Sequence, residues 1–138
     1  TTHDLPTVAG WWTGTDLDWR RRLGQLDDQG LDAARADREK DKQLLIQAMS
    51  SSARVTQVGD TPPVPQVLEW VAASPAPLCV FPIEDLMSLP DQPNMPGTDV
   101  EGGHPNWLRR LPVDVSSLFD NDIVIKSIRA IRRGRGRK

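Results

Sequence analysis

The sequence predicts an α/β fold, and three observations along the chain support this prediction. Apolar residues recur at helical intervals from Val64 to Val71, and a short, nearly continuous apolar run follows at residues 78–83. Prolines separate the two segments. A helix followed by a strand that is buried on both faces is the repeating unit of an α/β barrel. We therefore expect a mainly helical chain with one clear strand.

The first half of the chain predicts three helices. Thr7 is placed to cap a short helix that carries Trp11 and Trp12, and Asp16 to cap a second helix that ends near Gly24. A longer helix is expected over residues 32–49. Its middle is almost wholly charged, with opposite charges at helical spacing, which is typical of a face in contact with solvent. The tryptophans, also at helical spacing, are expected to be core anchors.

The second half alternates helices with loops. Residues 65–73 predict a helix with proline in its first turn, and residues 78–83 predict the strand. Residues 88–105 are rich in Pro, Gly and Asn and predict a long irregular segment, of a length usually found in functional or disordered loops. From about residue 114 to residue 133, apolar side chains on one side predict a helix or a broken pair of helices.

Length and composition fit one domain. The chain has 138 residues, and no apolar run approaches the roughly 20 residues that span a bilayer. Cys79 is the only cysteine, so no disulfide can form within the chain, and we expect a buried thiol and a cytoplasmic location. The first residue is Thr and falls inside a motif, so we expect the chain to be a fragment of a longer protein.

Charge is unevenly distributed. All 19 acidic residues precede Lys126, and seven of the 17 basic residues lie at 126–138, so the two parts carry net charges of −9 and +7. A basic tail can bind nucleic acid, or its cations can complement the negative end of a helix. The tail has no aromatic residue on which a base could stack. We expect the structural role, with no nucleic-acid or membrane partner.

The motif THDLPT, residues 2–7, contains the first candidate site residues. His3 and Asp4 precede Pro6, and a proline stops a strand ladder. At the end of a strand, unlike in its middle, the chain can turn and direct both side chains into one cleft. A carboxylate beside an imidazole could hold a polyhydroxylated or cationic substrate. On spacing alone, such a pair is more often an ordinary loop dipeptide.

Further motifs follow in the second half: Glu84-Asp85, then NMPGT at 94–98, and HPNWLRRL at 104–111. Together with residues 2–7, their order and separation resemble the C-terminal part of the 4-alpha-glucanotransferases, also called amylomaltases or disproportionating enzymes. The resemblance covers nearly the whole chain, 1–138. It implies the C-terminal portion of a (β/α)8 barrel of the alpha-amylase type, with residues 2–4 ending the seventh strand and 78–83 forming the eighth.

The resemblance implies a retaining transfer of an α-1,4-glucan segment to the 4-hydroxyl group of an acceptor glucan. Positive charge develops on the sugar during this reaction, so nearby carboxylates stabilise the transition state. Asp4 corresponds to the family's third catalytic carboxylate, which grips ring hydroxyls, and His3 to a hydrogen-bond donor to the same ring. The two motifs should therefore meet at one sugar-binding cleft. No cofactor or metal is implied.

Four further residues are assigned by the resemblance. Asn94 is expected to contact glucan near the scissile bond, with Pro96 and Gly97 shaping its loop. Glu84 and Asp85 are expected to orient that loop without contacting the substrate themselves.

One departure limits the activity expected of this chain. The nucleophile and the acid/base of the family lie upstream of Thr1, so the chain alone is expected to be inactive. Gly102-Gly103 looks like a small insertion, which affects the placement of Glu101 and His104. Two alternatives remain open: a non-catalytic α-glucan-binding module, and a small nucleic-acid binder that would show steep salt dependence.

Overall fold

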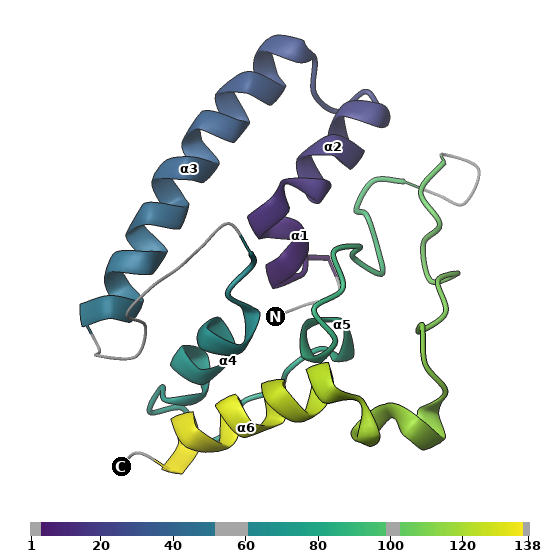
Figure 1. Cartoon of the computed structure of the whole chain (residues 1–138). Helices are drawn as coiled ribbons and strands as arrows, with labels where there is room; N and C mark the ends of the chain where they lie inside the picture. The colour runs from purple at the N-terminus through teal and green to yellow at the C-terminus, as the bar shows by residue number, and fades with distance from the viewer. Residues whose placement is uncertain (1–3, 52–60, 99–102, 137–138) are drawn as a thin grey trace.

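The computed structural model describes residues 4–51, 61–98 and 103–136, and this part of the chain is helical. Figure 1 shows α3 standing beside α1 and α2, with α4, α5 and α6 gathered below them. The elements, in order, are α1 (Val8–Thr13), α2 (Thr15–Arg22), α3 (Asp28–Ser51), α4 (Val64–Ala72), α5 (Ile83–Leu86), the 3-10 helix η1 (Val115–Asp120) and α6 (Asp122–Gly136). The prediction of a mainly helical chain is confirmed.

The first two helices begin and end close to the predicted positions. Thr7 caps α1, since its Oγ1 accepts a hydrogen bond from the Gly10 amide at 3.0 Å. Gly14, with φ of +83°, ends α1 and immediately precedes α2. The prediction that Asp16 caps the second helix is wrong. Gly14 occupies the N-cap, and Asp16 lies in the first turn, where a negative charge complements the helix dipole.

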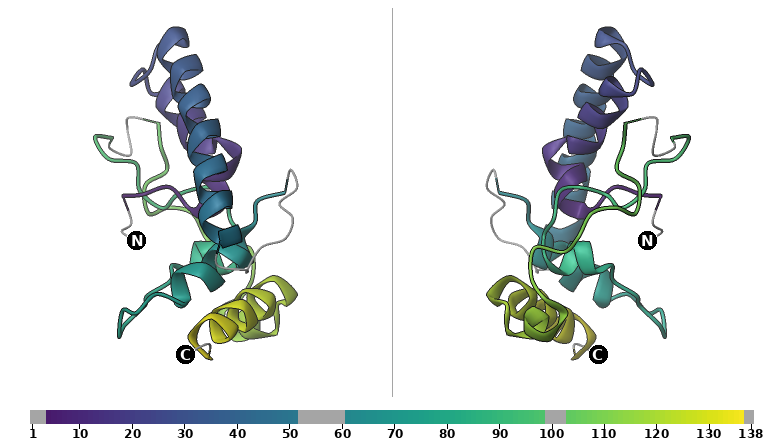
Figure 2. Two further views of the ribbon diagram at one scale, coloured as in Figure 1. Left: turned by 90° about the vertical axis from the view of Figure 1, so that its left-hand side faces the viewer. Right: turned by 90° about the vertical axis from the view of Figure 1, so that its right-hand side faces the viewer.

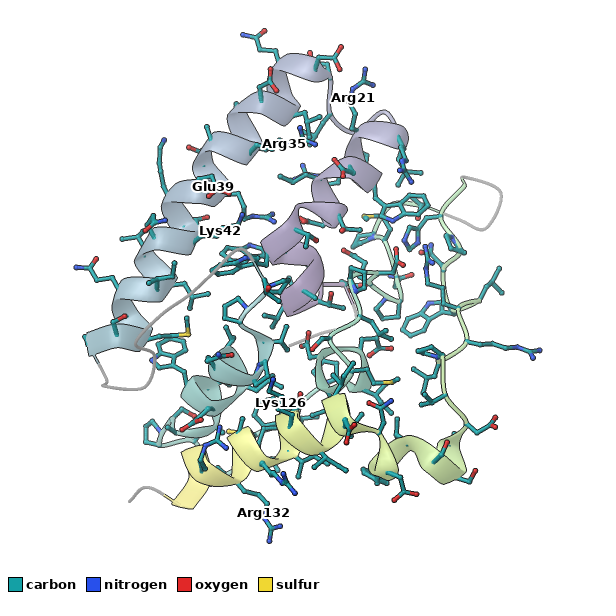
Figure 3. All side chains as sticks on the ribbon, viewed as in Figure 1. Arg21, Arg35, Glu39, Lys42, Lys126 and Arg132 are labelled. Carbon is teal, nitrogen blue, oxygen red and sulfur yellow. The ribbon has the colours of Figure 1, made fainter. Side chains whose placement is uncertain are left out.

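The long helix α3 packs on α1 and α2 through charged side chains. We predicted that residues 35–42 face solvent, and this is wrong in part: Arg35 and Lys42 project towards α2 and α1 (Figure 3). Arg35 pairs with Asp18 at 2.7 Å, and the Lys42 ammonium lies 5.5 Å from the centre of the Trp12 ring. Long basic side chains can cover apolar surface and keep their charge in water, which the charge pattern alone does not reveal.

The helices α4 and α6 pack closely against each other, as the views in Figures 1 and 2 agree. A Cβ atom at Gly134 of α6 would lie 2.3 Å from the Glu69 carbonyl oxygen, so only glycine permits this approach. Arg133 pairs with the Glu69 carboxylate at 2.8 Å, and Arg135 donates to the carbonyls of Ala76 and Pro77. Parts of the predicted basic tail are therefore bound to the protein itself, while Arg132 points away (Figure 3).

The predicted strand at residues 78–83 is absent from the described structure. Residues 78–82 are irregular, Ile83 begins α5, and Leu78 and Val80 are 77% and 73% exposed. A parallel strand needs hydrogen-bonding neighbours, and the described residues contain no other strand to provide them. Cys79, predicted to be buried, is partly exposed.

Length alone would make α3, with 24 residues, the natural candidate for a membrane span. None of the described helices, however, is both long and apolar enough to cross a membrane.

Candidate functional site

A polar cleft of about 240 Å³ lies beside the segment that precedes α1. Asp4 and Pro6 form part of its wall, Asp16 and Arg20 come from α2, and Gln25 follows that helix. Gln92, Met95 and Pro96 complete the lining from the segment that we call the Asn94 loop, residues 92–98. Charged and amide side chains thus surround a small cavity open to solvent, which suits a ligand rich in hydroxyl groups.

Asp4, which lines this cleft, is hydrogen-bonded to Asn94 although 90 positions separate the two residues in the sequence. The Asn94 Nδ2 atom donates to the Asp4 Oδ1 atom at 2.7 Å. Pro96 lines the same cleft, and its carbonyl accepts a hydrogen bond of 3.4 Å from Gln25. Gly97 follows with φ of +76°, a conformation that favours glycine and turns the loop. Of the residues assigned from the sequence, Asn94 therefore contacts Asp4, Pro96 lines the same cleft, and Gly97 belongs to the same loop.

Asp85 holds the start of α1, directly after the segment that carries Asp4. Its buried Oδ1 atom accepts a hydrogen bond of 2.7 Å from the Val8 amide. Burial raises the pKa of the Asp85 carboxyl above its ordinary value, and the hydrogen bond from Val8 opposes that rise. Thr7 adds a second connection, since its hydroxyl donates to the Leu89 carbonyl at 2.6 Å.

Close backbone packing fixes α1 against the residues that lead into the Asn94 loop. A Cβ atom at Gly10 would lie 2.2 Å from the Pro90 carbonyl oxygen, so no larger residue fits without displacing the backbone. α1 therefore fixes the position of the segment that carries Asp4 relative to the segment that carries Asn94.

The remaining predicted site residues are not at this cleft or cannot be placed. Glu84, predicted beside Asp85, lines a different cleft of about 510 Å³ together with Trp107, Arg109 and other residues. His3, Glu101 and Gly102 lie outside the described residues. Trp107, which lines the same cleft as Glu84, is 63% exposed and has φ of +60°.

Residues 1–116 of the chain match the family of 4-alpha-glucanotransferases. The chain belongs to this family. A 4-alpha-glucanotransferase from Haemophilus influenzae is 24% identical over 143 residues, an alignment that covers 97% of this chain and 20% of that protein. The chain thus spans about a fifth of the length of this relative. The family match includes all the motifs on which the resemblance rested and ends before α6.

Four polar lining residues of this 4-alpha-glucanotransferase chain were not predicted: Asp16, Arg20, Gln25 and Gln92. The first two are separated by four positions and so share one face of α2, a signal that the sequence did contain. Arg38 of α3 binds the Asp16 carboxylate through two hydrogen bonds of 2.9 and 2.8 Å. The positions of the two glutamines depend on irregular loops, which no periodicity predicts.

Proposed function

We propose that the complete protein to which this chain belongs transfers a segment of an α-1,4-glucan to the 4-hydroxyl group of an acceptor glucan, with retention of configuration. Membership of the 4-alpha-glucanotransferase family supports this proposal. The single observation that carries it is the hydrogen bond between Asn94 and Asp4, a residue that lines the polar cleft.

In this proposal, Asp4 grips ring hydroxyls while positive charge develops at the anomeric carbon. A carboxylate can accept several hydrogen bonds at once, so Asp4 can bind Asn94 and sugar hydroxyls together. Asn94, oriented towards Asp4, contacts the glucan near the scissile bond, and His3 donates to the same ring. Asp85 acts from behind by fixing the start of α1. Pro96 and Gly97 set the shape of the Asn94 loop, and no cofactor is needed for this chemistry.

We further propose that the chain forms the C-terminal portion of a (β/α)8 barrel in the complete protein. The exposed apolar side chains of Leu78 and Val80 support this, because the interior and the outer helices of a complete barrel would cover side chains at these positions. The nucleophile and the acid/base then come from outside residues 1–138, and the isolated chain is inactive. A cytoplasmic location is proposed from the single cysteine, Cys79.

A non-catalytic α-glucan-binding module is the second candidate. The same cleft would serve it, and the position of Glu84 in a separate cleft favours it slightly, since one expected supporting carboxylate is missing from the Asp4 side. The basic tail gives little support to a nucleic-acid binder, because Arg133 and Arg135 contact the protein itself.

Incubation of the complete protein with maltotriose tests the proposed function. We expect glucose together with maltooligosaccharides longer than the substrate, and no products from the 138-residue chain alone. Longer products are decisive because hydrolysis cannot generate them. Binding of maltotriose by the complete protein without any turnover would contradict transfer and identify the glucan-binding module instead.

A further inference from the structure

We propose that Asn106 is a positioning residue for the Asn94 loop and that the buried His104 helps to hold its amide in place. This inference rests on the proposed function for its effect on turnover, but not for the contacts on which it depends. The Asn106 side chain contacts two residues of the Asn94 loop, Met95 and Thr98.

The amide of Asn106 makes hydrogen bonds at both ends. Its Oδ1 atom accepts from the Met95 backbone amide at 2.8 Å. Its Nδ2 atom donates to the Thr98 carbonyl at 3.1 Å and contacts the Thr98 hydroxyl at 2.9 Å. The Thr98 hydroxyl donates in turn to the Met95 carbonyl at 2.7 Å. Asn106 is only 7% exposed, so water cannot readily replace these hydrogen bonds.

His104 supports the same orientation of this amide. Its Nδ1 atom lies 2.6 Å from the Asn106 Oδ1 atom, and the whole side chain is inaccessible to solvent. The Met95 amide can only donate, so the atom that it meets must be the oxygen of Asn106. The Nδ1 atom of His104 therefore carries the proton and donates to the same oxygen. Among the described residues, no polar atom bonds to the opposite nitrogen, Nε2.

The imidazole is itself held in place by an aromatic contact. The ring centres of His104 and Trp19 are 4.7 Å apart, and the rings meet edge to face at 79°. Trp19 belongs to α2, the helix that supplies Asp16 and Arg20 to the cleft. Its indole also donates to Asp91 at 3.3 Å, immediately before the Asn94 loop. The loop is therefore fastened to the wall of the cleft through a fixed series of side chains.

These contacts reach the residue next to Asn94, whose side-chain amide is the group proposed to contact the glucan. The Met95 backbone amide, held by Asn106, belongs to the residue that follows Asn94, whose side chain lies 2.7 Å from Asp4. Loss of the Asn106 amide frees the Met95 backbone and displaces the Asn94 side chain from Asp4. A displacement of about 1 Å at a reacting centre can lower a rate about 100-fold.

The first test measures transfer from maltotriose by variants of the complete protein. Asn106→Ala is expected to lower kcat by at least about 10-fold, because the Asn94 side chain is then misplaced. His104→Phe removes the donor and is expected to lower kcat similarly, whereas His104→Asn retains an amide donor and restores most of it. Asn121→Ala is the matched control. The Asn121 Oδ1 atom accepts a hydrogen bond of 3.0 Å from the Ile123 amide at the start of α6, away from the Asn94 loop, so its loss is expected to leave kcat unchanged.

A double-mutant cycle separates positioning from a general loss of stability. If Asn106 acts through Asn94, Asn106→Ala costs little further activity in an Asn94→Ala background. Equal losses of kcat in both backgrounds would overturn the proposal, as would a loss in Asn121→Ala that matches that of Asn106→Ala. Wild-type protein without transfer activity would contradict the proposed function instead.

Hydrogen exchange at the Met95 amide tests its hydrogen bond to Asn106 without relying on enzyme activity. In the wild-type protein, the amide is expected to exchange slowly because it donates a hydrogen bond to the Asn106 Oδ1 atom. Asn106→Ala and His104→Phe should increase the exchange rate at least about 10-fold, and His104→Asn should preserve the protection. Unchanged protection of Met95 in Asn106→Ala would overturn the inference, whether or not the protein transfers glucan.

Discussion

The two sides of this molecule are held together by different kinds of contact. On one side, α4 and α6 pack mainly through small and apolar residues, with Gly134 against the backbone of Glu69 and with Val64 and Val124 fully buried, and one ion pair between Arg133 and Glu69 joins them. On the side of the cleft, charged and amide groups connect the elements, including the Arg38 and Asp16 pair and the Asn106 amide. Apolar packing shapes a surface, whereas paired polar groups fix the positions of individual atoms.

The difference matters for function because a cleft that binds hydroxyl groups needs oriented polar atoms. A buried polar atom that loses its partner costs about 1–3 kcal/mol. Asp16 illustrates this, because it lines the cleft and is held by Arg38 from behind. The polar side of the molecule is therefore the more sensitive to the loss of single partners.

The largest expected effect on stability comes from Arg38→Leu. The side chains of Arg38 and Asp16 are only 12% and 9% exposed, so the change leaves a buried carboxylate without its partner. We expect a loss of about 3 kcal/mol in the free energy of unfolding, measured by urea denaturation. Arg35→Leu, on the same helix, breaks an exposed pair with Asp18 and should cost less than about 1 kcal/mol. Equal losses in the two variants would remove the distinction between buried and exposed contacts.

A smaller loss is expected on the apolar side from Gly134→Ala. The added Cβ atom would meet the Glu69 carbonyl oxygen at 2.3 Å and the Ala72 Cβ atom at 2.9 Å, so α4 and α6 must move apart. Overpacking of this kind costs about 2 kcal/mol. Gly136→Ala, two residues along α6, meets no atom within 4 Å and should leave the urea midpoint unchanged or slightly higher. A tolerated Gly134→Ala would show that the helices do not approach this closely.

The helices were largely predictable from the sequence because their signals are local. Thr7 as a cap, the apolar spacing from Val64 to Val71 and a break before the last helix all appear in the structure. The cap at Asp16 failed because Gly14, with its positive φ, already occupies that position. The prediction of a strand at residues 78–83 was wrong because a strand forms only where a second strand pairs with it. The described residues contain no such strand, and Leu78 remains exposed.

The site was predictable only where a family motif marked it. Asp4 and Asn94 were assigned by resemblance, and they meet, but nothing in residue spacing places positions 4 and 94 together. The supporting groups were missed because their partners are nonlocal: Asn106 contacts Met95 and Thr98, and Arg38 contacts Asp16. Such contacts depend on the tertiary structure and have no periodic signature in the sequence.

The most direct test of the central claim is the rate of maltotriose disproportionation by the complete protein with Asp4→Asn. This change keeps the size of the side chain and removes the charge that is proposed to stabilise the transition state. We expect kcat/KM to fall at least about 100-fold, with an unchanged urea midpoint, whereas Asp18→Asn on α2 retains wild-type activity. Wild-type kcat/KM in Asp4→Asn would contradict the proposed role of this carboxylate.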